Sequence, residues 1–277
     1  MTIIEAIILG IIQGLSEFIP ISSTAHLTLA GHLFNLIDPS HPERWTAFIA
    51  VIQLGTLAAV FIYFSKDIKS IISNYFSENI GKNRKSFKEQ SNHSKLGWLI
   101  IIGSLPIGLF GFLLKDLIEG TFTKSPFVIA TMLILVAIIL FIAEKTAKFK
   151  KDMNKISIKD SLFVGFAQCL ALIPGTSRSG ATITTGLFLG IKRDVAARFS
   201  FLLSIPAIFA SGLYEFYKSI SYINSQDLFI IIVATIVSAI SGYLSIAFLL
   251  KFLKTKSTLL FIFYRIVLGL VVLFYFS

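Results

Sequence analysis

Two short stretches of sequence interrupt otherwise apolar segments and decide how this chain folds. Residues 19–26 read IPISSTAH, and residues 173–182 read IPGTSRSGAT. Each stretch leads from an apolar helix into a proline, then into a cluster of hydroxyl side chains with a titratable or charged residue, His26 or Arg178. Polar groups at this density are costly in an apolar environment unless they are paired. We therefore expect each stretch to form part of a site.

The composition is that of a membrane protein. Of the 277 residues, 55% are hydrophobic and 14% are charged, with a mean hydropathy of +0.81, whereas a soluble domain averages about 25% charged residues. The net charge of +10 does not indicate nucleic-acid binding, because the basic residues lie in short loops between apolar runs. The single Cys169 excludes a disulfide framework. The first residues carry Glu5 and no basic region, so no cleaved signal peptide is predicted.

Six segments are apolar and long enough to cross a bilayer, which takes about 20 residues. They are residues 45–64, 96–114, 126–143, 197–216, 228–250 and 258–276. Two further segments, 2–30 and 161–190, are apolar but contain proline, glycine and the hydroxyl clusters near their middle.

The loop charges orient these segments. Three loops carry most of the lysine and arginine surplus: 65–95, 144–160 and 251–257. The other three loops, 31–44, 115–125 and 217–227, carry little of it. The positive-inside rule places the first three in the cytoplasm. Counting crossings then leaves segment 161–190 beginning and ending on the cytoplasmic side, which predicts a re-entrant hairpin. Segment 2–30 is predicted to be a second hairpin that enters from the exterior.

The two halves therefore share one plan, a hairpin followed by three spans, in opposite orientations. We expect an all-α polytopic membrane protein with an inverted repeat, six transmembrane helices and two re-entrant helical hairpins, an architecture typical of many transporters. The chain forms a single integral membrane domain over residues 1–277, with repeat one at about 1–150 and repeat two at about 151–277. The steps Ile19-Pro20 and Ile173-Pro174 align between the halves.

The second stretch has the residue types that hold a phosphoryl group. A proline ends the incoming helix, and hydroxyls cap the outgoing one, whose N-terminus favours anions. Arg178 adds a planar cationic fork that suits phosphate. The candidate phosphate-binding hydroxyls of this stretch are Ser177, Ser179 and Thr182.

The first stretch contributes different chemistry. Gln13 and Glu17 are four residues apart on the incoming helix and share a face, so their oxygens suit a hard cation such as Mg²⁺ or Ca²⁺. Ser23 and His26 are three apart on the outgoing helix, and a hydroxyl beside an imidazole can form an activated nucleophile or a proton donor. Together with Arg178 this set predicts phosphoryl transfer.

Hydroxyl run 22–24 also has simpler interpretations. The run could be only a helix cap, and one of its three side chains is expected to cap the outgoing helix. Ser22 and Thr24 are candidate phosphate-binding residues. The sequence does not identify which oxygen of the run attacks, if any. Glu17 could pin the hairpin only, and His26 could be structural. Arg265 lies deep in the last span without an obvious partner, and the sequence assigns it no role.

The two stretches closely resemble the two motifs of the undecaprenyl-diphosphate phosphatases, also called bacitracin-resistance proteins. The matching residues are Gln13-xxx-Glu17, Pro20-x-Ser22-Ser23-Thr24-x-His26 and the run 174–182, and the resemblance covers the whole chain. It implies hydrolysis of undecaprenyl diphosphate in recycling the lipid carrier of bacterial cell-wall synthesis. It also implies an inner-membrane location and a site that faces the exterior.

The same resemblance implies that Glu17, Ser23, His26 and Arg178 are essential and that a divalent cation takes part. Members differ between Glu and Gln at the first acidic position, and Gln13 here leaves Glu17 as the one charged ligand. The expected partners are undecaprenyl diphosphate and membrane lipid, with no nucleic acid and with a homodimer left open. Two rival functions are a transporter or flippase of polyprenyl phosphate lipid on the same fold, and a phosphatase acting on other lipid phosphates.

Overall fold

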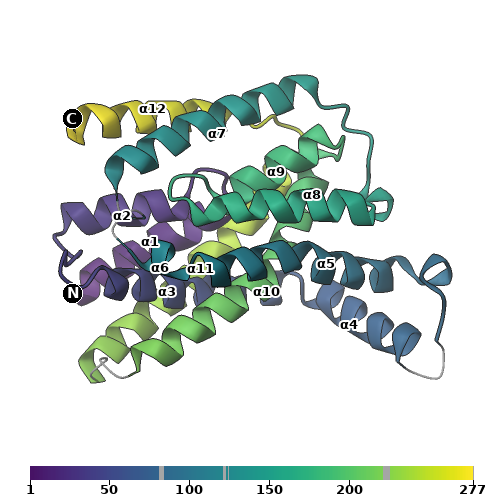
Figure 1. Ribbon diagram of the computed structural model, residues 1–277, viewed down its shortest axis with the longest axis horizontal. Helices are drawn as coiled ribbons and strands as arrows, with labels where there is room; N and C mark the ends of the chain where they lie inside the picture. The colour runs from purple at the N-terminus through teal and green to yellow at the C-terminus, as the bar shows by residue number, and fades with distance from the viewer. Residues whose placement is uncertain (81–83, 121–122, 124, 221–224, 277) are drawn as a thin grey trace.

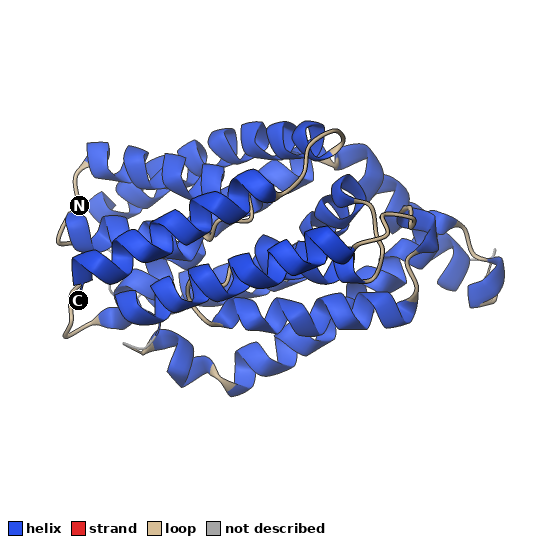
Figure 2. Cartoon of the chain, turned by 90° about the horizontal axis from the view of Figure 1, so that it is seen from above, coloured by secondary structure: helices blue, strands red, loops and turns tan. Residues whose placement is uncertain are grey.

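The computed structural model describes residues 1–80, 84–120, 123, 125–220 and 225–276, and over these residues it is helical with no strand (Figures 1 and 2). The shorter elements are α4 (Ser65–Asn79), η1 (Phe87–Glu89), α6 (Lys115–Glu119), η3 (Met153–Lys155) and η4 (Leu170–Leu172). Four helices flank the two hydroxyl-rich stretches: α1 (Ile3–Phe18), α2 (Ser23–Leu33), α8 (Ile158–Cys169) and α9 (Arg178–Phe188).

Six helices among the described residues are long and apolar enough to span a membrane, as the sequence predicts. They are α3 (Pro42–Tyr63), α5 (Asn92–Leu113), α7 (Pro126–Thr146), α10 (Arg193–Ser219), α11 (Ser225–Leu253) and α12 (Leu259–Phe276). Several extend a few residues beyond the predicted segments, because polar first-turn residues and capping side chains continue a helix past its apolar stretch. The chain is thus a multi-pass membrane protein.

The two interrupted segments each fold as a pair of short helices joined by a break. The first break runs over residues 19–22 between α1 and α2, and the second runs over 173–177 between η4 and α9. Each break contains the proline that the sequence places there, and proline lacks the N–H that would continue the helix. Within each pair the two helices contact one another.

The first helix of each pair packs closely against a predicted span, and a glycine lies at the contact. Helix α1 packs on α11, where a Cβ added at Gly14 would lie 2.0 Å from the Ser241 hydroxyl. Helix α8 packs on α5, where a Cβ at Gly165 would lie 2.2 Å from the Gly103 carbonyl. Backbones approach this closely only because glycine has no side chain.

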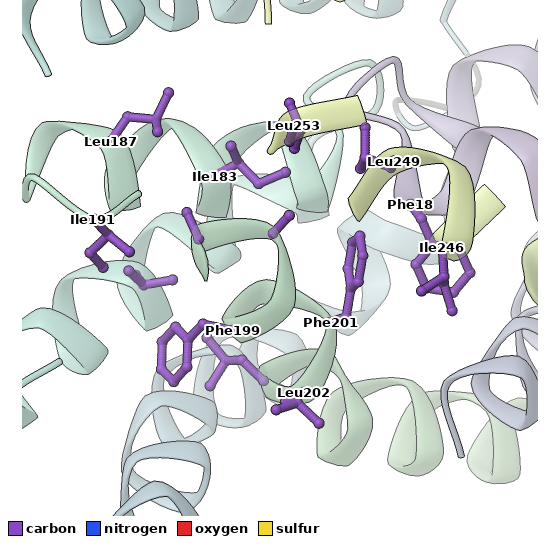
Figure 3. Close-up of a cluster of buried hydrophobic side chains, with 14 of the residues drawn as sticks. Phe18, Ile183, Leu187, Ile191, Phe199, Phe201, Leu202, Ile246, Leu249 and Leu253 are labelled. Atoms are coloured by element: carbon purple, nitrogen blue, oxygen red, sulfur yellow. The ribbon is translucent and has the colours of Figure 1, made fainter. Parts of the chain in front are cut away.

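A cluster of buried apolar side chains lies directly beside the first break (Figure 3). Phe18, the last residue of α1, is 1% exposed and packs edge-on against Phe201 of α10, with ring centroids 5.0 Å apart. Further members come from α9 and α11, including Ile183 and Ile246. Because Phe18 follows Glu17 in the chain, this packing holds the end of α1 in place.

The loops that carry the basic surplus gather at one end of the molecule. Lys192 pairs with Asp152 at 2.6 Å and Arg198 pairs with Asp67 at 2.6 Å, which ties together segments far apart in sequence. Glu144 at the end of α7 pairs with Arg193 at the start of α10. Both chain termini lie at the opposite end of the long axis (Figures 1 and 2).

Candidate active site

The two breaks share one backbone conformation. Ser22 has φ 78° and Ser177 has φ 67°, a region that L-residues rarely adopt. Each serine hydroxyl then accepts the N–H three residues later, from Ala25 at 3.3 Å and from Gly180 at 3.1 Å. The hydroxyls identified as candidate caps in sequence therefore cap α2 and α9, and Ser22 and Ser177 are the ones that do so. Strain of about 1–3 kcal/mol at such a residue persists only where the surroundings hold it.

The pairing of hydroxyls repeats as well. Ser22 Oγ lies 3.2 Å from Thr24 Oγ1, and Ser177 Oγ lies 3.1 Å from Ser179 Oγ. Superposing the caps makes Ser23 and Arg178 equivalent, because each is the first residue of its helix. The two helices thus present different chemistry from the same local position.

Glu17 joins these two positions. Its Oε2 accepts from Ser23 Oγ at 2.5 Å and from Gln13 Nε2 at 3.0 Å, while its Oε1 accepts from the Arg178 guanidinium. The Glu17 side chain is 3% exposed and that of Arg178 is 16% exposed. A largely desolvated carboxylate thus contacts a hydroxyl, an amide and a cation, which come from α2, α1 and α9.

His26 follows Ser23 by three residues on α2, and within the described residues it forms no hydrogen bond with Ser23. Its Nδ1 is 2.7 Å from the Ser22 carbonyl and its Nε2 is 2.7 Å from the Tyr264 hydroxyl, with the two rings stacked. A carbonyl only accepts, so Nδ1 carries a hydrogen. When the ring is neutral, Nε2 then accepts from the Tyr264 O–H. The spacing of Ser23 and His26 suggests that they pair, whereas among the described residues Ser23 donates to Glu17.

The remaining hydroxyls of the second stretch face different ways. Ser179 Oγ donates to the backbone carbonyls of Glu17 and Ile19, each at 3.3 Å, and so ties α9 to the first break. Thr182 bonds Ser200 of α10 at 2.6 Å and the Arg178 carbonyl at 2.7 Å, and it is 1% exposed. The Thr182 hydroxyl therefore already has partners within the protein, one of them on α10.

The residues near Glu17 fit a hard cation in part. Gln13 is fully buried, and its Oε1 has no hydrogen-bond partner within the described chain. That oxygen belongs to the amide whose Nε2 donates to Glu17 Oε2 at 3.0 Å, and amide and carboxylate oxygens are ligands that Mg²⁺ and Ca²⁺ prefer. No cluster of three or more His, Cys, Asp or Glu side chains suited to a metal occurs in the part of the chain that the structure describes. Oxygens from another molecule would have to complete the coordination shell.

Two residues of the site, Tyr264 and Arg265, were not assigned to it from the sequence, and both lie on α12. Tyr264 contacts His26, and Arg265 contacts both breaks through backbone carbonyls, those of Pro20, Gly175 and Thr176. An arginine inside a span is a signal of function. Its partners could not be read from sequence, because they are backbone atoms about 90 and 245 residues away.

A pocket of about 450 Å³ at the end of the molecule with the basic loops is not this site. Its charged lining includes Asp67, Asp152 and Arg198, which pair with each other or with Lys192. None of the residues around Glu17 lines it.

Comparison with known proteins gives one result along the whole chain. The family model described as "Bacitracin resistance protein BacA" matches residues 6–271. A protein of Syntrophobacter fumaroxidans named undecaprenyl-diphosphatase is 56% identical over 269 residues, covering 97% of this chain and 95% of that protein. Proteins with the same name are 49% identical in Chloroherpeton thalassium, over 99% of this chain and 96% of theirs, and 44% identical in Paenarthrobacter aurescens, over 98% and 95%.

Proposed function

The chain belongs to the family of the bacitracin resistance protein BacA, and from this premise we propose how it hydrolyses undecaprenyl diphosphate to undecaprenyl phosphate and phosphate. It is a membrane hydrolase of cell-wall biogenesis that confers bacitracin resistance. One observation carries the mechanism: the buried Glu17 carboxylate accepts from Ser23 and from Arg178, the first residues of two helices. A nucleophile, its base and a phosphate-binding cation therefore lie at one point.

The helix N-termini bind the diphosphate. Ser22 and Ser177 each satisfy one N–H of their helix, so other N–H groups of both first turns remain for phosphate oxygens. Arg178 has five donors and shares them between Glu17 and the terminal phosphate. Ser179 keeps α9 against the first break, so the two N-termini converge on the same phosphoryl group.

Ser23 is the attacking group in this mechanism. Its oxygen forms a bond to the terminal phosphorus as its proton passes to Glu17, 2.5 Å away. The bond from that phosphorus to the bridging oxygen breaks, and undecaprenyl phosphate leaves with the bonding electrons. The oxygen of a water molecule then forms a bond to the phosphorus, and the water gives a proton to His26, whose Nε2 exchanges the Tyr264 hydroxyl for the water. The bond from phosphorus to the Ser23 oxygen breaks, Glu17 returns its proton to that oxygen, inorganic phosphate leaves, and His26 releases its proton to solvent.

A divalent cation, Mg²⁺ or Ca²⁺, belongs to the proposal through Gln13 and Glu17. Gln13 Oε1 and the Glu17 carboxylate would hold it, and it would neutralise charge on the diphosphate oxygens. The support is the buried Gln13 oxygen, which otherwise has no partner among the described residues.

The inverted repeat and the two re-entrant hairpins are also part of this proposal. The packing supports them, because α1 of the first half lies on α11 of the second and α8 of the second half lies on α5 of the first. The equivalent spans α3 and α10 contact one another, as do α7 and α12. Matching positive φ values at Ser22 and Ser177 support the same relation between the hairpins.

We place the protein in the bacterial inner membrane with the basic loops in the cytoplasm and the site open to the exterior. In a background with Cys169 replaced, single cysteines at Asp38 and Lys150 test this orientation. We expect an impermeant thiol reagent added outside intact cells or spheroplasts to label position 38 and to leave position 150 unlabelled until the membrane is opened. Labelling in the reverse order would reject the orientation.

Phosphate release by the purified protein in lipid tests the function itself. With undecaprenyl diphosphate and Mg²⁺ or Ca²⁺ we expect turnover by the wild type and none by the Glu17→Ala, Arg178→Ala double variant. Equal release by the two proteins would reject the active centre. Rates on short prenyl diphosphates and on phosphatidic acid, measured alongside, report how far the enzyme selects its lipid.

A further inference from the structure

Arg265 is a buried cation for which the mechanism so far has no use. Its residue is 0% exposed, and it lies on α12 where that helix packs against α7. Among the described residues no carboxylate forms an ion pair with it. Its guanidinium instead donates to five backbone carbonyls, those of Pro20, Met132, Leu133, Gly175 and Thr176.

Three of these carbonyls belong to the two breaks. Nη1 donates to Pro20 at 3.1 Å, and Nη2 donates to Gly175 at 2.9 Å and to Thr176 at 3.0 Å. Pro20 lies two residues before Ser22, and Gly175 lies two residues before Ser177. One guanidinium therefore binds, in each break, the carbonyl that lies two residues before the strained serine.

The other contacts fix the guanidinium itself. Nε donates to Leu133 at 3.2 Å and Nη2 lies 3.2 Å from the Met132 carbonyl, so α7 orients the fork. Space for it exists beside α9 because Gly180 has no side chain: an added Cβ would lie 3.2 Å from Nη1. A planar fork with donors on three nitrogens can join these carbonyls, and the compact ammonium of lysine cannot.

We propose that Arg265 is a positioning residue for the hydrolysis, holding the two breaks in register so that Ser23 and Arg178 meet at Glu17. It acts through the carbonyls of Pro20 and Gly175 and does not touch the substrate. The inference rests on the proposed function of the Glu17 centre. It also explains how two serines keep positive φ values, because such strain needs surroundings that hold it.

The test compares Arg265→Lys with wild type, as purified protein in lipid with undecaprenyl diphosphate and a divalent cation. Misplacing the serine and the arginine by a fraction of an ångström should lower kcat about 10- to 100-fold. KM should change less than kcat, because the N–H groups at the starts of α2 and α9 and the charge of Arg178 still bind the diphosphate. Rates are expressed per folded molecule, from thermal unfolding and from the monodisperse fraction in size-exclusion chromatography.

Gly269→Ala is the matched structural control. Gly269 lies one turn after Arg265 at the same contact with α7, and its added Cβ would come 2.6 Å from Ile134 Cγ1. This substitution disturbs α7–α12 packing and leaves both breaks alone. We expect a lower unfolding temperature and an unchanged kcat per folded molecule.

A second variant keeps the test decisive if Arg265→Lys does not fold. Gly180→Ala retains the arginine and favours the helical state of α9, yet its Cβ pushes on Nη1 and on Ser177. We expect a several-fold loss of kcat without loss of folded protein. Wild-type kcat in Gly180→Ala, or in folded Arg265→Lys, would overturn the proposal, and the latter result would show that charge alone suffices. Lack of activity in the wild-type enzyme would count against the proposed function instead.

Discussion

Replacing Glu17 by glutamine is expected to lower kcat/KM for undecaprenyl diphosphate by about 10³- to 10⁴-fold, since a positioned base contributes about 10²–10⁴ and this base also carries an ion pair. Glutamine keeps the size of the side chain and still accepts through one oxygen. It cannot take up the Ser23 proton, and it removes the charge that pairs with Arg178. The measurement is phosphate release under saturating and limiting substrate.

The two kinetic constants should respond differently. Loss of the base lowers kcat, because the proton of Ser23 has no acceptor in the transition state. KM should change less or even fall, since Arg178 is released from Glu17 and is free to bind phosphate. A variant with wild-type kcat and raised KM would contradict the role of Glu17 as a base.

Glu144→Gln is the control for this substitution. Glu144 is also a buried glutamate that pairs with an arginine, Arg193, and it accepts from Thr258 Oγ1 at 2.9 Å. It lies at the end of the molecule with the basic loops, where the last turn of α7 pairs with the first residue of α10. Breaking a buried pair there is expected to destabilise the fold by about 3–5 kcal/mol and to leave kcat per folded molecule unchanged.

The fold could be predicted from sequence because its determinants are local. Apolar length identified the six spans, and a proline followed by hydroxyls identified both breaks. Helix ends were less predictable: α10 begins at Arg193, four residues before its predicted segment, because charged residues in a first turn are helical without being apolar. The orientation stays a prediction that the labelling experiment tests, and the re-entrant hairpins also stay a prediction.

The site was predictable in its members and not in its contacts. Glu17, Ser23 and Arg178 stand out as polar residues in an apolar chain, and all three meet. Helical spacing suggested Ser23 and His26 as partners, but the backbone at the start of α2 turns the Ser23 hydroxyl toward Glu17 and points the imidazole to Tyr264. Thr182 shares the hydroxyl-rich stretch, yet tertiary packing directs it to Ser200.

Ser23→Ala is expected to lower kcat on the order of 10⁶-fold, as removal of the nucleophilic serine does in a serine protease. The variant should fold, because Ser22 and not Ser23 caps α2. Ser245→Ala is the control: this buried serine of α11 donates to the Leu15 carbonyl at 2.9 Å, near the site but outside it. It loses one hydrogen bond, about 1 kcal/mol, and should keep wild-type kcat.

Two measurements separate attack by Ser23 from attack by water. With the wild type, acid quenching during turnover should yield a peptide phosphorylated at Ser23. Two successive displacements should also retain configuration at a chiral terminal phosphorus, whereas direct attack by water inverts it. Inversion together with near-normal kcat in Ser23→Ala would make water the nucleophile. Glu17 would then serve as the base for that water, and the 2.5 Å contact from Ser23 would only orient the carboxylate.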